Sequence, residues 1–168
     1  MTAIGPYTQS YDYTFMYNIP DLRGTLPVKA NCPGTISDIL ATNTNFSLFY
    51  YTLKKAGLEG IYDALQANCT LFVPADRFLN PDIFINIDRN TARTLINSST
   101  LDRFIPSELL EDSPASFYLT RNPYNKLFIS NLSGQTYINN CIRVVQKDIM
   151  CKNGIIHVVD GLLDPVFN

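Results

Sequence analysis

The chain has 168 residues, of which 46% are hydrophobic and 17% charged, and its formal net charge at pH 7 is −2. This length fits one domain that folds without a metal or a disulfide, and the composition excludes an intrinsically disordered chain. The near-neutral charge gives no basic footprint for nucleic acid as a partner. We also predict no membrane span, because no apolar run approaches the roughly 20 residues that cross a bilayer.

Residues 1–34 are predicted to form an extended arm that precedes the domain. Prolines and glycines recur there, helical periodicity is absent, and aromatic side chains alternate with other residues at the two-residue period of a strand. These four aromatic residues are Tyr11, Tyr13, Phe15 and Tyr17. We expect this aromatic edge to bind a partner protein or the chain's own domain. The first residues lack the positive start and apolar core of a secretory signal, which predicts a cytosolic protein or a mature chain behind a new Met.

Three helices are predicted at the start of the remaining segment, residues 35–168. Thr35 and Asp38 have the spacing of a capping box, so a helix begins at Thr35. A second helix covers 46–53 and ends before Gly57, and a third covers 58–65. Their predicted buried faces are Phe46, Phe49, Tyr50 and Leu53 in the second helix, and Ile61, Tyr62 and Leu65 in the third.

A buried strand follows at Cys69–Pro74, and helical pieces are predicted over 76–87. Asp88 is placed to cap a helix with an apolar face formed by Ala92, Leu95 and Ile96. From Leu101 onward the pattern indicates strands, separated by turn residues. The predicted strands are 101–105, 115–121, 126–131, 135–139, 141–147 and 154–160. Helices followed by an antiparallel meander indicate the α+β class.

The last strand carries a specific motif. An Asn153-Gly154 turn precedes a strand in which apolar residues surround His157, then Asp160 follows, and a Leu-x-Pro ends at Pro165. This stretch resembles the second signature box of the fasciclin (FAS1) domain family. We expect Gly154 to adopt the positive φ that many turns require.

An earlier stretch resembles the first box of the same family. Its matching residues are Thr70, Phe72, Pro74 and Asp76, with Leu79 where the family has a closing aromatic residue. The resemblance covers residues 35–166. It implies a wedge of about seven mostly antiparallel strands with the helices packed on it. It also implies that the strand ending at Pro74 lies beside the last strand and that the boxes serve mainly to maintain the fold.

The family also has a Tyr-His pair between the boxes that is tied to adhesion through integrins. Here Arg103 or Phe104 stands where the His would be. The resemblance therefore does not extend to integrin-type recognition.

The sequence predicts no enzymatic activity, metal or cofactor. His157 and Asp160 lie three positions apart on a strand, so their side chains point to opposite faces and cannot form part of a triad. A single His and four unclustered Cys do not make a zinc site, and no nucleophile elbow or phosphate loop occurs. The carboxylates Asp76, Glu108, Glu111 and Asp112 form no known catalytic motif.

Cysteines and sequons leave the compartment open. Cys32, Cys69, Cys141 and Cys151 fit either reduced thiols or one or two disulfides. Candidate glycosylation sites are Asn45, Asn68, Asn97 and Asn131, a mild excess over chance.

We therefore predict a non-catalytic interaction protein. The main hypothesis is a component of a larger protein assembly, in a virion or the cytosol, for example a minor capsid protein of a large virus. The alternative is a secreted or cell-surface adhesion domain of the extracellular matrix. A third hypothesis is a small-ligand binder that uses a pocket between the helices and the sheet.

Overall fold

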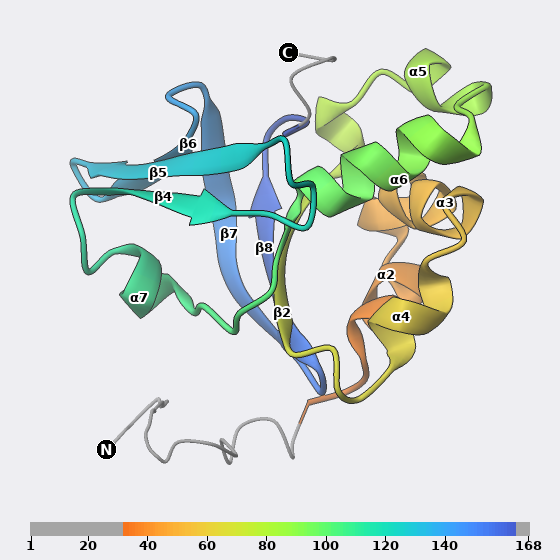
Figure 1. Ribbon diagram of the computed structural model, residues 1–168, viewed down its shortest axis with the longest axis horizontal. Coiled ribbons are helices and arrows are strands. Elements are labelled where there is room, and N and C mark those ends of the chain that lie inside the picture. Colours follow the sequence, from red (N-terminus) through yellow and green to blue (C-terminus); the bar gives the residue numbers. More distant parts are fainter. Residues whose placement is uncertain (1–31, 164–168) are drawn as a thin grey trace. The chain divides into compact units, whose positions relative to one another are not determined.

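A computed structural model describes residues 32–163 of the chain (Figure 1). The chain divides into two units, one formed by residues 1–34 with 150–152 and the other by 35–149 with 153–168. In the first unit, the backbone N–H of Lys152 donates to the carbonyl of Gly34 at 2.8 Å. The predicted aromatic edge of the arm (Tyr11, Tyr13, Phe15 and Tyr17) and Pro165 of the second box lie outside the described residues.

The second unit begins with helix α2 (Ile36–Thr42), and the predicted capping box is confirmed. The side chain of Thr35 accepts from the N–H of Asp38, and the Asp38 carboxylate accepts from the N–H of Thr35. One 3₁₀ turn (Thr44–Phe46) leads into α3 (Ser47–Lys55), and Gly57 ends it with φ of 72°. The capping box of α2 thus satisfies backbone N–H groups that the start of a helix leaves without partners.

The third helix, α4 (Glu59–Asp63), is shorter than predicted, and its predicted apolar face is wrong in part. Tyr62 is fully buried, whereas Ile61 is 51% and Leu65 is 67% exposed. The backbone turns to an extended conformation at Ala64, so Leu65 leaves the helical spacing on which the prediction rested.

The centre of the chain alternates short helices and strands. Strand β2 (Cys69–Pro74) is buried throughout, as predicted. The predicted helical pieces are a 3₁₀ turn (Asp76–Phe78) and α5 (Asp82–Ile85), and Asp88 caps α6 (Arg89–Ser98) through a bond from the N–H of Thr91. The predicted strand 101–105 is only β3 (Thr100–Leu101), and the next segment contains α7 (Ser107–Leu110), which was not predicted.

The remaining strands form a meander: β4 (Ala115–Leu119), β5 (Lys126–Leu132), β6 (Gln135–Ile138), β7 (Ile142–Cys151) and β8 (Gly154–Val159). The strand order in the seven-stranded sheet is β3-β2-β8-β7-β6-β5-β4. The first box therefore lies beside the second, as expected, and the two strands run parallel, with Thr70 opposite Ile155 and Phe72 opposite His157. The other registered pairs are antiparallel.

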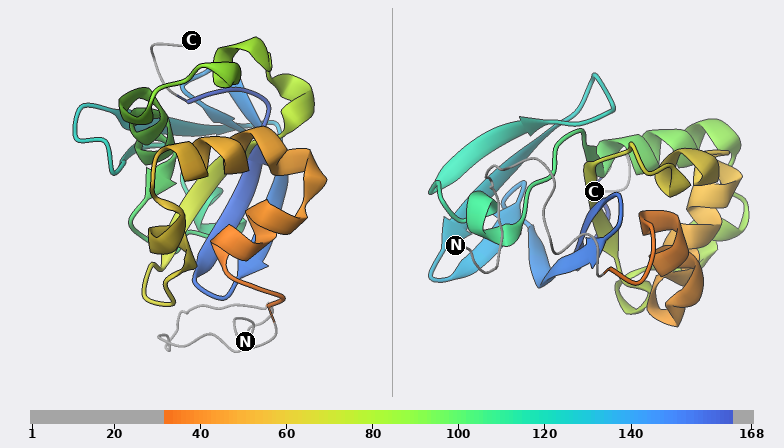
Figure 2. Two further views of the ribbon diagram at one scale, coloured as in Figure 1. Left: turned by 90° about the vertical axis from the view of Figure 1, so that its right-hand side faces the viewer. Right: turned by 90° about the horizontal axis from the view of Figure 1, so that it is seen from below.

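The sheet bends so that one apolar core fills the space between its two ends. Helices α2, α3, α4 and α6 lie on one side of β2 and β8, and β4–β6 lie on the other (Figures 1 and 2). Residues of β2 and β8 therefore need apolar side chains on both faces, which is why both strands are buried along their whole length. The core cluster between β2, β8 and β4–β6 includes Phe72, Leu127, Ile129, Ile138 and Val159. Within residues 32–163, the helices are too short and too polar for any of them to span a membrane.

The expectation that Gly154 has positive φ is wrong. Its backbone lies outside the left-handed region, and the reason for glycine is space. A Cβ at this position would overlap the carbonyl oxygen of Cys69 and come within 2.8 Å of the Ile36 side chain. Gly154 therefore lets β8 approach the start of β2 closely.

Candidate functional site

The residues of the two boxes form a buried polar clamp around the segment that follows β3. The hydroxyl of Thr70 donates to the carbonyl of Arg103 at 2.6 Å and accepts from the N–H of Ile105 at 2.8 Å. His157 Nε2 lies 2.8 Å from the carbonyl of Ile105. Thr70 and His157, from neighbouring strands, therefore hold the same three-residue segment against the sheet.

The contacts of His157 fix its tautomer. Its Nδ1 accepts from the backbone N–H of Asp148 at 3.1 Å, so the proton sits on Nε2 and is donated to Ile105. The ring is fully buried and lies 5.6 Å from the ring of Phe72. Desolvation by burial lowers the pKa of His157 below its usual value, so the neutral form is favoured. Both ring nitrogens are occupied by backbone groups, and the imidazole cannot serve as a general base for a substrate.

Asp148, which positions Nδ1, belongs to a second small network that was not predicted. It has φ of 63°, and its carboxylate accepts from the backbone N–H of Ser107 at 2.8 Å and from the Ser107 hydroxyl. Asp148 therefore connects the long strand β7 to the first turn of α7 and, through its own N–H, to His157.

Asn153 joins three elements at the β7–β8 turn. Its amide nitrogen donates to the carbonyls of Tyr62 and Ala64, each at 2.8 Å, and its amide oxygen accepts from the N–H of Ile36 at 2.8 Å. The side chain is only 1% exposed, so these bonds satisfy an otherwise costly buried amide. Asn153 therefore connects α2, α4 and β8.

The two box carboxylates lie apart from the clamp and from each other. Asp76 accepts from the backbone N–H of Leu48 at 2.9 Å and from the hydroxyl of Ser47, so it caps the start of α3. Asp160 accepts from the N–H of Arg143 at 2.8 Å and lies 3.8 Å from the guanidinium of the same residue. Neither carboxylate is near His157 in any described contact. Among residues 32–163, no three potential metal-ligating side chains cluster together.

A second candidate site is the exposed side of the strands β4–β6, which we call the outer β face. The register places Phe117 opposite Phe128, Ser130 opposite Tyr137, and Leu132 opposite Gln135 on this side. Phe117 is 68% and Leu132 is 69% exposed. The rings of Phe117 and Phe128 are 4.9 Å apart, and the ammonium of Lys126 lies 5.7 Å from the Phe117 ring. Neighbouring exposed apolar and aromatic groups are typical of protein-binding surfaces. The outer β face is defined by Phe117, Leu119, Phe128, Leu132 and Tyr137.

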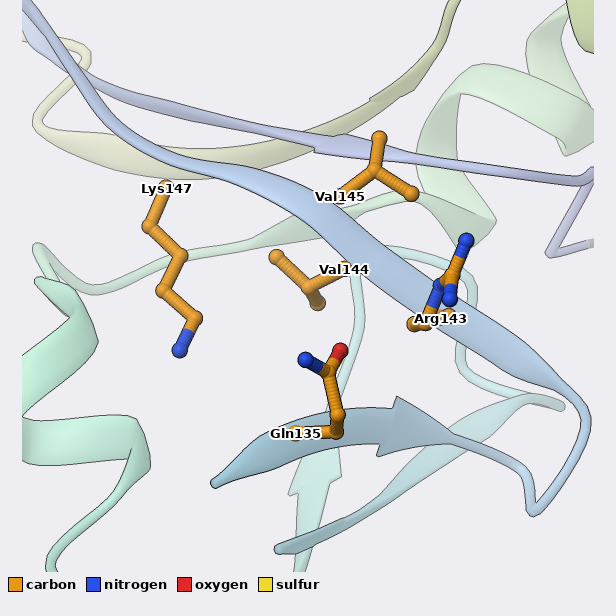
Figure 3. Close-up of a pocket in the computed structure, with 5 residues that line it drawn as sticks. All are labelled: Gln135, Arg143, Val144, Val145 and Lys147. Atoms are coloured by element: carbon orange, nitrogen blue, oxygen red, sulfur yellow. The ribbon is translucent and has the colours of Figure 1, made fainter. Parts of the chain in front are cut away.

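A polar hollow of about 370 Å³ opens where β6 and β7 separate beyond the pair Tyr137–Arg143 (Figure 3). Both of its cations already contact carboxylates: Arg143 lies beside Asp160, and Lys147 is bonded to Glu111. The remaining lining residues are Gln135, Val144 and Val145. The predicted pocket between helices and sheet is not this one, because this hollow lies between two strands.

The described cysteines and sequons differ in accessibility. Cys141 is an exposed free thiol, whereas Cys32, Cys69 and Cys151 are buried. Asn45 and Asn68 are exposed and Asn97 is half-buried. The amide nitrogen of Asn131 donates to the carbonyls of Leu110 and Ser113, each at 2.8 Å, so both of its donors are occupied.

The outer β face was missed because both sides of β4 carry large apolar groups. Phe117 and Leu119 alternate with Ser116 and Tyr118, so alternation alone does not say which side is buried. The neighbouring strand β5 indicates which side is buried. Its aliphatic residues Leu127 and Ile129 lie on the same side as Tyr118, and both are buried in the core.

Comparison with known proteins adds a family match. Residues 44–165 match the family model described as the fasciclin domain. This match covers both boxes, the clamp and the outer β face.

Two relatives agree with that match. The chain is 30% identical over 136 residues to human Stabilin-1, and the matched part is 79% of this chain and 5% of that protein. A fasciclin-domain pair from the insect cell adhesion molecule fasciclin I superimposes with a TM-score of 0.67 at 22% identity, over 79% of this chain and 51% of that one. The chain therefore spans a small part of Stabilin-1 and about half of the fasciclin I pair.

Proposed function

The chain belongs to the fasciclin domain family, and from that premise we propose that it is a non-catalytic module that binds other proteins in adhesion at a cell surface or in the extracellular matrix. The observation that carries this proposal is the difference between the polar residues of the boxes and the apolar residues of the outer β face. The polar groups of the two boxes are occupied by internal hydrogen bonds, whereas apolar groups of the outer β face point into solvent.

The relatives support an adhesive role over the assembly role. Fasciclin I is an insect cell adhesion molecule, and this chain shares its fold. Nothing in the comparisons supports a capsid protein. The buried, neutral His157 argues against acid–base catalysis at the position where the sequence offers its single imidazole.

Cell attachment tests the proposal. Adherent cells brought into suspension should attach in greater number to plates coated with the full chain than to plates coated with an unrelated protein. Soluble chain added to the cells should reduce this attachment. The double variant Leu132→Ser, Tyr137→Ser removes two side chains of the outer β face that lie on β5 and β6 and not on the edge strand β4. It should reduce attachment about fivefold or more, because a few apolar anchors dominate such contacts.

The matched control is the double variant Ile61→Ser, Ile85→Ser, which removes two apolar side chains that are 51% and 62% exposed on helices. It should attach cells as the unchanged chain does. Attachment no better than that to the unrelated protein, or an equal loss in both variants, would contradict the proposal.

A second candidate function is a component of a larger protein assembly, held by the arm. The specific observation in its favour is the alternation of Tyr11, Tyr13, Phe15 and Tyr17 in the sequence. Such an aromatic edge suits strand addition to a neighbouring protein. The adhesive function requires an extracellular chain, whereas the assembly function fits a chain in the cytosol or a virion. The two functions therefore predict different states of glycosylation and of the cysteines.

A further inference from the structure

Strand β4 ends the seven-stranded sheet and has a neighbour on one side only. Among residues 32–163, the backbone of Ala115–Leu119 makes its backbone hydrogen bonds with β5 and with no other segment. An edge strand of this kind presents a row of N–H and C=O groups to an incoming strand.

The register identifies which backbone groups face outward. The N–H of Asn131 donates to the carbonyl of Pro114 at 2.9 Å, so this pair is of the hydrogen-bonded kind. Hydrogen-bonded and non-bonded pairs alternate along an antiparallel ladder. Ser116 and Tyr118 therefore face β5, and Ala115, Phe117 and Leu119 direct their N–H and C=O groups away from it. The Ser113 hydroxyl, which donates to the carbonyl of Ala115 at 3.0 Å, agrees with that direction.

The strand lacks the features that normally prevent edge pairing. Ala115–Leu119 contains no proline and no charged residue. Phe117 is 68% and Leu119 is 77% exposed, and both side chains lie on the outer β face. Lysine, proline or a bulge at such positions is the usual protection.

We propose that β4 pairs with β4 of a second copy of this chain, antiparallel, about a two-fold axis at Phe117. The three outward residues are spaced symmetrically about Phe117. Phe117 would therefore pair with its own counterpart, and Ala115 with Leu119 of the other copy. Every outward N–H and C=O of the three residues gains a partner in this register, and each small Ala115 lies across from a large Leu119.

The charges on either side of the strand also suit a second copy. Asp112 precedes β4 and Lys126 follows it, whereas Glu111 and Arg121, which also flank the strand, already contact Lys147 and Asp102. An antiparallel two-fold arrangement brings the acidic start of each strand toward the basic end of the other, which favours association. The contact uses the same surface of both copies, so it closes as a dimer and does not extend into a fibre. This inference does not depend on the proposed adhesive function.

Substitutions that place opposite charges at Phe117, on the two-fold axis, test the dimer. In the full chain, sedimentation velocity over a concentration series should show a reversible monomer–dimer equilibrium. Phe117→Lys and Phe117→Glu each place like charges opposite each other and remove the apolar pair. Each should raise the dimer dissociation constant about tenfold or more. An equimolar mixture of the two variants should restore a dimer, because the opposite charges then face each other.

The matched controls are Leu132→Lys and Leu132→Glu, at a residue that is 69% exposed on the same face but lies on β5. They should dimerise as the unchanged chain does. A full chain that stays monomeric over the whole series, or two Phe117 variants that do not dimerise when mixed, would overturn the proposal. Cell attachment is measured with changes off β4, so the two proposals fail independently.

Discussion

At the residue scale, the histidine of the second box is a structural group. A neutral imidazole can donate one hydrogen bond and accept one, and His157 does both with backbone partners from β7 and from the segment after β3. An apolar residue at this site leaves the buried carbonyl of Ile105 and the partly buried N–H of Asp148 without these partners. This requirement explains why a fold-maintaining motif contains a residue that is usually associated with catalysis.

The substitution His157→Leu should lower the free energy of unfolding by about 2 kcal/mol, because it leaves the buried carbonyl of Ile105 and the partly buried N–H of Asp148 without their partner. Urea denaturation at pH 7.5 measures this change. A loss below about 0.5 kcal/mol would contradict the assigned role, since that is the size of an ordinary surface substitution.

The stability of the unchanged chain should depend on pH through the same residue. Burial lowers the pKa of His157 in the folded protein below the ordinary value of 6.5, so the unfolded chain binds the proton more readily. The contribution of the neutral ring is complete above pH 6.5 and is lost as the pH falls through the folded pKa. The free energy of unfolding should therefore decrease between pH 7.5 and 5.5, and His157→Leu should remove this component of the decrease. Equal slopes in both proteins would contradict the effect.

The residues of the clamp were predictable as a set, but their bonds were not. The resemblance to the two family boxes identified Thr70 and His157, and also Asn153 at the neighbouring turn. The partners of these residues are mostly backbone groups, such as the carbonyls of Tyr62 and Ile105, and the sequence does not show where a backbone carbonyl points. Asp148 was missed for a related reason, because its role depends on a positive φ within a strand.

At the scale of elements, the close approach of β2 and β8 rests on one glycine. Gly154→Ala should cost about 3 kcal/mol of stability, because the added methyl group meets a backbone carbonyl that cannot move aside cheaply. Thermal unfolding measures the loss. Gly60→Ala is the matched control, since nothing lies within 4 Å of its added Cβ in α4, and it should stabilise by about 0.5–1 kcal/mol. Similar effects of the two changes would show that the contact with Cys69 does not matter.

Strong local signals predicted elements well, and weak ones did not. Capping side chains located the starts of α2 and α6, and the turn residues separated β5, β6 and β8 near their observed bounds. The strand predicted at 101–105 fails because Thr70 and His157 hold residues 103–105 by contacts distant in sequence. Helix α7 has a single turn, which gives too few residues for a period to be read.

At the scale of the whole molecule, the sequence predicted the layers but not the exposed face. Buried strands such as β2 and β8 are mostly apolar on both sides, which is visible as an apolar run that only Thr70 and His157 interrupt. The strands β4–β6 have one side in the core and one in solvent, and this assignment depends on the bend of the sheet. The outer β face and the free edge of β4, on which the two proposals rest, therefore become visible only in three dimensions.

The covalent state of the chain isolated from its source separates the adhesive function from the assembly function. An extracellular chain passes through the secretory pathway, so we expect N-glycans on the exposed Asn45 and Asn68 and none on Asn131. A glycan on Asn131 would replace an N–H that donates to the carbonyl of Leu110 or Ser113. In a secretory expression host, intact mass should fall with Asn45→Gln and Asn68→Gln by the mass of a glycan, and Asn131→Gln should leave the glycan mass unchanged. An unmodified, fully reduced chain from the natural source would contradict the extracellular reading and favour an assembly held together through the arm.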